Sequence, residues 1–103
     1  MNNNSQNLQE FSIELNIRAL RTLKNGRVIS NFARMMSIFR IPLAIPKKEV
    51  LTEFVEDTKF FKENEQLINW LAPDTFTEEL SEQMDSMIDL CEHLLNESGL
   101  YSQ

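Results

Sequence analysis

The stretch NGRVISNFARMMSIFRIPLAIPKKEV, residues 25–50, contains the signals on which the predicted fold depends. Asn25 and Gly26 form the residue pair that most easily adopts left-handed backbone angles, so a helix that began earlier is expected to end there. Residues 27–39 place their apolar side chains within about half of a helical circumference, which predicts a second helix. The two prolines of IPLAIP cannot continue that helix, and residues 41–46 are therefore expected to form an apolar extended connector.

Upstream of this stretch, helical periodicity predicts a first helix. Asn7 is expected as its N-cap, with Glu10 completing a capping box, and the helix should run to about Lys24. Its apolar residues fall into two stripes, so the helix is expected to contact more than one neighbour from a central position in a bundle. The first stripe is Leu8, Phe11, Leu15, Ala19 and Leu23, and the second is Ile13, Ile17 and Leu20.

Downstream, a third helical region is predicted from near Pro46 to about Leu71. Its apolar phase slips once, which predicts a bend or break near Thr58. The last helix is expected to have Thr75 as its N-cap and to end at Gly99.

These patterns predict an all-α protein, a small bundle of four to five helices in a single domain. The domain is expected at residues 8–100, after a flexible polar leader at residues 1–7 and before a tail at residues 101–103. The longest uncharged apolar run has six residues, far fewer than the roughly 20 that span a bilayer, so no membrane span is expected. A single cysteine, Cys91, favours a reducing and therefore cytoplasmic location.

The net charge of -6 hides a strong asymmetry along the chain. Residues 1–48 contain eight basic residues and two carboxylates, a balance of +6, whereas residues 49–103 contain two lysines and fourteen carboxylates, a balance of -12. Such an asymmetry can be neutralised within the fold, between two copies, or by a partner, and all three remain open at this stage.

The motifs of phosphate-binding loops, dinucleotide-binding folds, zinc proteases and serine hydrolases are absent from the chain. His93 is the only histidine and is interpreted as solvent-facing, while Cys91 lies on an apolar helix face that should raise its pKa. Neither an enzyme activity nor a cofactor or metal site is expected. One face of the last helix is interpreted as solvated or as an acidic protein-facing surface. Its carboxylates are Glu78, Glu82, Asp85, Asp89 and Glu92.

The combined pattern predicts a small acidic interaction protein that regulates, inhibits, chaperones or assembles with a larger protein. Its binding segment is expected at residues 27–48, where positive charges and apolar side chains occur together, and an acidic partner surface would complement it. Trp70 lies off the apolar stripe of its helix and is either covered by the connector or a contact anchor. The predicted contact residues are Arg27, Arg34, Arg40, Ile41, Leu43, Ile45, Lys47, Lys48 and Trp70.

Further interpretations remain open, one of which is association with a membrane surface through the arginine-bearing amphipathic helix. The basic residues in the range 18–48 could instead bind nucleic acid, although a pI near 4.7 argues against it because the other half of the chain repels phosphates. A homodimer is another alternative, because five residues of the last helix repeat in the spacing of a coiled-coil seam. They are Leu80, Met84, Met87, Cys91 and Leu94. Met35 and Met36 are interpreted either as core or as partner-facing.

Overall fold

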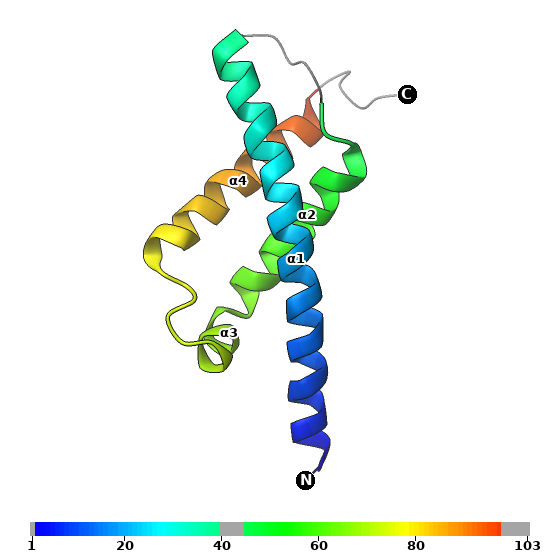
Figure 1. The fold of residues 1–103 in the computed structure, drawn as a ribbon, viewed down its shortest axis with the longest axis vertical. Coiled ribbons are helices and arrows are strands. Elements are labelled where there is room, and N and C mark those ends of the chain that lie inside the picture. Colours follow the sequence, from blue (N-terminus) through cyan, green and yellow to red (C-terminus); the bar gives the residue numbers. More distant parts are fainter. Residues whose placement is uncertain (1, 40–44, 98–103) are drawn as a thin grey trace.

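In a computed structural model, the described parts of the chain, residues 2–39 and 45–97, form four α-helices and no strand (Figure 1). This confirms the all-α class, with four helices from the predicted four to five. In chain order they are α1 (Asn2–Phe39), α2 (Lys48–Glu63), α3 (Glu65–Leu71) and α4 (Glu78–Asn96).

The predicted helix end at Asn25 and Gly26 is wrong, because α1 continues without interruption through both residues. Asn25 is buried, and a Cβ atom added to Gly26 would lie 3.5 Å from the Phe54 ring of α2. The pair therefore lies where α1 approaches α2, and tertiary packing overrides its local preference for a turn. The helix also begins at Asn2, before the predicted N-cap Asn7.

The break in the third helical region exists, but it lies at Asn64 and not near Thr58. Thr58 is fully buried inside α2, whereas the backbone N–H of Asn64 donates to the carbonyls of Phe60 and Phe61 at 3.1 and 3.2 Å. The Asn64 side chain also donates to the Phe60 carbonyl at 2.9 Å. These bonds satisfy the last carbonyls of α2 and end the helix.

The last helix is capped by Thr77 and not by the predicted Thr75. The Thr77 hydroxyl accepts a hydrogen bond from the backbone N–H of Leu80 at 3.1 Å, while Thr75 donates its hydroxyl to the carbonyl of Ala72. The helix ends at Asn96, and the predicted end at Gly99 lies outside the described residues.

α2 contacts both α1 and α4, so α2 and not α1 occupies the central position of the bundle. Figure 1 shows α1 crossing in front of the other helices, with both of its ends extending beyond them. At about 1.5 Å per residue, its 38 residues account for the longest dimension of the molecule, 55 Å. The main core cluster joins three helices and consists of Ile29, Phe32, Leu51, Phe54, Val55, Cys91 and Leu94.

Candidate protein-interaction surface

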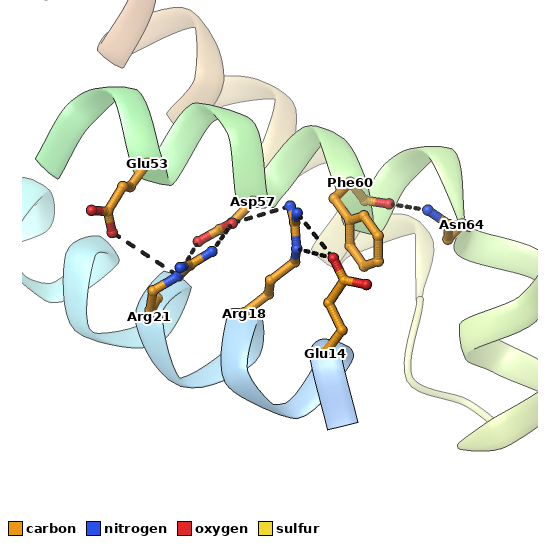
Figure 2. A network of polar contacts seen from close by, with 7 residues as sticks. All are labelled: Glu14, Arg18, Arg21, Glu53, Asp57, Phe60 and Asn64. Atoms are coloured by element: carbon orange, nitrogen blue, oxygen red, sulfur yellow. Dashed lines mark hydrogen bonds and ion pairs between the residues drawn. The ribbon is translucent and has the colours of Figure 1, made fainter. Parts of the chain in front are cut away.

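A buried carboxylate anchors the N-terminal half of α1 to α2 (Figure 2). Asp57 is only 1% exposed, and Arg21 binds it with two parallel hydrogen bonds of 3.0 Å from Nε and 2.8 Å from Nη2. Arg18 adds a third bond from Nη1 at 3.2 Å. The hydrogen bond to Asp57, reinforced by the charge of that carboxylate, raises the pKa of Arg21 above its ordinary value. A fork of this kind fixes geometry as well as adding energy.

Further contacts hold the two arginines of this cluster in place. Arg18 donates from Nε to Glu14 at 3.1 Å, and its guanidinium lies 4.2 Å from the centre of the Phe60 ring. Glu53 lies 4.0 Å from Nε of Arg21. Two charges of the basic half of the chain are therefore used to join α1 to α2. One local signal marked this cluster: Asp57 lies on the apolar face of its own helix, where an isolated carboxylate would be costly.

The predicted basic contact residues that the structure describes all lie on the surface. Arg27, Arg34, Lys47 and Lys48 are exposed, and their side chains make no ion pair or hydrogen bond with residues 2–39 or 45–97. Ile45 is exposed beside them in sequence. Three further predicted contacts, Arg40, Ile41 and Leu43, lie outside the described residues.

Apolar side chains lie among these charges on the C-terminal half of α1. Val28, Met35 and Ile38 are exposed, and Ile38 reaches 61%. At 100° per helical residue they share about a third of the circumference with Arg27 and Arg34. Figure 1 places the end of α1 and the start of α2 at the same end of the molecule. We call this region the basic surface; its described members are Arg27, Val28, Arg34, Met35, Ile38, Ile45, Lys47 and Lys48.

Trp70 does not belong to the basic surface. Its ring is 65% exposed, which favours the interpretation as a contact anchor over a covered residue. However, α3 lies at the end of the molecule away from the start of α2 (Figure 1). The two groups of predicted contacts are therefore separate surfaces.

An apolar groove runs between α1 and α4, with α2 and α3 contributing to its floor. It consists of two adjoining depressions of about 340 and 350 Å³ that share Thr22, Leu23, Leu80 and Met84. The hydroxyls of Thr22 and Thr58 lack a hydrogen-bond partner in the part of the chain that the structure describes. The groove has no local signal in the sequence, because its two walls are fifty or more residues apart along the chain.

The predicted dimer seam on α4 is largely used inside the molecule. Cys91 and Leu94 are buried in the core, while Met84 and Met87 are half-buried and line the groove. Cys91 is fully buried in the described structure, so its side chain is not exposed on the α4 surface. Burial raises the pKa of Cys91 to about 12, which confirms the expected direction.

The acidic face of α4 is partly neutralised by α2. Lys62 donates to Asp85 at 2.6 Å, and Lys59 donates to Glu92 at 3.0 Å. Arg27 and Arg34 form no ion pair with Glu82, Asp85 or Asp89 within the described residues. His93 is exposed, as predicted, and lies 3.3 Å from Glu97.

The described residues contain neither a cluster of metal-binding side chains nor a membrane-spanning helix. No group of three or more histidine, cysteine, aspartate or glutamate side chains is arranged to hold a metal ion. None of the helices in residues 2–39 and 45–97 combines the length and the apolar character needed to cross a membrane.

No protein-family model matches this chain. Searches of curated proteins and of solved structures also found no significant match.

Proposed function

We propose that this protein is a small interaction protein that regulates, inhibits, chaperones or assembles with a larger protein. It docks through the basic surface, and its partner presents carboxylates around an apolar patch. The observation that supports this proposal is the unequal use of arginines on α1. Arg18 and Arg21 are bound by Asp57, whereas Arg27 and Arg34 remain exposed without a partner among the described residues.

The composition of the basic surface fits a protein partner better than a partner that is bound through charge alone. Met35 and Ile38 are exposed next to the arginines, and exposed apolar groups rimmed by charge are typical of interaction sites. The charged groups would steer association and set orientation, and the apolar groups would supply most of the buried area. Methionine is flexible and polarisable, so it can adapt to a partner surface.

Nucleic-acid binding has weaker support from the same geometry. Asp57 binds two of the charges in the range 18–48, so fewer remain to contact phosphates. The exposed carboxylates of α4, including Glu79 and Glu82, would repel a polyanion near α1.

The test is affinity capture with the full chain as bait in an extract of its native host, treated with nuclease. The informative variant is Arg34→Glu with Ile38→Glu, which changes two exposed side chains and leaves the core intact. A partner that uses the basic surface should be captured at least about tenfold less by this variant. Its binding to wild type should also weaken as salt increases, since exposed charges are screened.

The matched control is Lys24→Glu with Leu20→Glu, which makes the same two changes at exposed positions in the N-terminal half of α1. This control variant should still capture the partner as well as wild type does. Equal capture by wild type and by the Arg34 and Ile38 variant would contradict the proposal. Loss of every partner on nuclease treatment would favour nucleic acid instead.

A further inference from the structure

The N-terminal half of α1 carries a second uncovered face, which we call the outer stripe. Its members follow one another at alternating spacings of three and four residues, the repeat of a coiled-coil seam. All six are exposed, and Leu20, at the centre, is 70% exposed. They are Glu10, Ile13, Ile17, Leu20, Lys24 and Arg27.

The other two faces of α1 are directed toward the remaining helices, so the outer stripe has no neighbouring helix within the described chain. One face packs on α2 through the Asp57 cluster and through Phe11, whose ring centre lies 5.6 Å from that of Phe60. A second face lines the groove toward α4, with Leu15, Ala19 and Leu23. The two stripes predicted from the sequence differ in part: Phe11 and Leu15 of the first are half-buried, and Ala19 and Leu23 are exposed along the groove. The second stripe is exposed at all three of its residues.

The two ends of the outer stripe carry opposite charges, so the stripe is complementary to a second copy of itself that runs in the opposite direction. It begins with a carboxylate at Glu10, continues through three apolar residues, and ends with Lys24 and Arg27. The side chains of these three charged residues form no ion pair elsewhere in the described chain. Two parallel copies would bring like charges together at both ends, whereas two antiparallel copies would bring opposite charges together.

We propose that two copies of this chain pair through the outer stripe, with their α1 helices antiparallel. A two-fold axis between Ile17 and Leu20 places Ile17 of one copy against Leu20 of the other. The same register places Glu10 against Arg27 at each end, and Ile13 against the aliphatic stem of Lys24. Every contact occurs twice, so the interface closes on itself as a dimer and does not propagate.

One feature of the fold favours a second copy as the occupant of this face, and another restricts how that copy can be aligned. Helices depend on tertiary packing for most of their stability, and the N-terminal end of α1 extends beyond the other helices without a neighbour (Figure 1). A lysine within an apolar seam also restricts the register, because Lys24 must reach the edge of the interface to be solvated. The outer stripe shares Arg27 with the basic surface, but in this register Ile38 has no residue of the partner helix opposite it. The two proposals can therefore be tested with separate variants.

The first experiment measures the mass of the full-length protein by sedimentation equilibrium, at concentrations up to about 200 μM. Wild type should form a reversible dimer. Leu20→Glu should raise the dimer dissociation constant at least about tenfold, because it places two carboxylates at the centre of the seam. The matched control Ile38→Glu makes the same kind of change at an exposed position of the same helix and should leave the constant unchanged.

A charge exchange tests the antiparallel register. Glu10→Lys and Arg27→Glu should each weaken the dimer several-fold when alone, because each creates two like-charge contacts. The chain that carries both changes should regain the wild-type dissociation constant, and an equimolar mixture of the two single variants should dimerise like wild type. A parallel pair would behave differently, since the single variants would be no weaker than wild type.

Three results would overturn the proposal: a wild-type monomer throughout this concentration range, a dimer unaffected by Leu20→Glu, or a double charge variant as weak as the single ones. Circular dichroism of each variant excludes misfolding as the cause. Leu20→Glu and Glu10→Lys lie outside the basic surface, so loss of the dimer in these variants can be distinguished from loss of partner capture in the Arg34 and Ile38 variant.

Discussion

Two pairs of arginines on one helix have opposite roles in this molecule. Arg18 and Arg21 converge on Asp57 and join α1 to α2, with three hydrogen bonds between 2.8 and 3.2 Å. Arg27 and Arg34 lie further along the same helix and contact no carboxylate among the described residues. A basic run in a sequence is therefore not one functional unit, because the fold itself neutralises part of it.

The difference between the two pairs comes from what lies opposite them. The first pair faces an acid that is 1% exposed on the apolar side of α2, where leaving it unpaired would be costly. The second pair faces solvent, where isolated charges cost little. Only the second pair is available to a partner, and this availability supports the proposed function.

The largest expected effect contrasts the two pairs directly. Arg18→Ala with Arg21→Ala should lower the free energy of unfolding by about 3–4 kcal/mol, because Asp57 would remain buried without a partner. Arg27→Ala with Arg34→Ala should change it by no more than about 0.5 kcal/mol. Urea denaturation followed by circular dichroism measures both. Similar losses for the two variants would mean that all four arginines contribute to the fold.

A smaller effect is expected when the carboxylate is removed. Asp57→Ala should cost about 1–3 kcal/mol, less than removal of the arginines, because both guanidinium groups are partly exposed and can be hydrated. The control Glu53→Ala removes an exposed carboxylate that also faces Arg21 and should cost about 0.5 kcal/mol or less. If the two variants are equally stable, the buried cluster does not hold the helices together.

The smallest effect tests whether both arginine pairs lie on one continuous helix. Gly26→Ala should raise the free energy of unfolding by about 0.5–1 kcal/mol, because alanine favours a helix interior more than glycine. The added Cβ would lie 3.5 Å from Phe54, an ordinary van der Waals contact. A loss of stability would instead indicate the left-handed turn that Asn25 and Gly26 predict from the sequence alone.

Features with local signals were predictable from the sequence. The helical class, the burial of Cys91 and the end of α3 at Leu71 follow from apolar periodicity and from proline. Two of the misplaced boundaries share one cause. Gly26 and Thr58 carry local signals for a turn or cap, but each packs against neighbouring helices.

The candidate site was only partly predictable, for a related reason. The exposure of Arg27 and Arg34 follows from helical periodicity. The pairing of Arg21 and Arg18 with Asp57 instead depends on contacts across 36 and 39 residues. Nothing near either arginine in the chain indicates that partner. The groove between α1 and α4 was likewise not predictable, because its walls come from distant parts of the chain.

By itself, the sequence determined the all-helical class, the separation of positive and negative charge, and the two apolar stripes of the first helix. These properties depend on residues within a few helical turns of one another. Only the tertiary structure decided that α1 continues past Gly26, which arginines remain free, and which apolar residues of that helix stay exposed. The physical reason is that burial and ion pairing are set by groups brought together from distant parts of the chain. The free energies of burial and ion pairing exceed the local backbone preferences, so tertiary contacts decide the outcome.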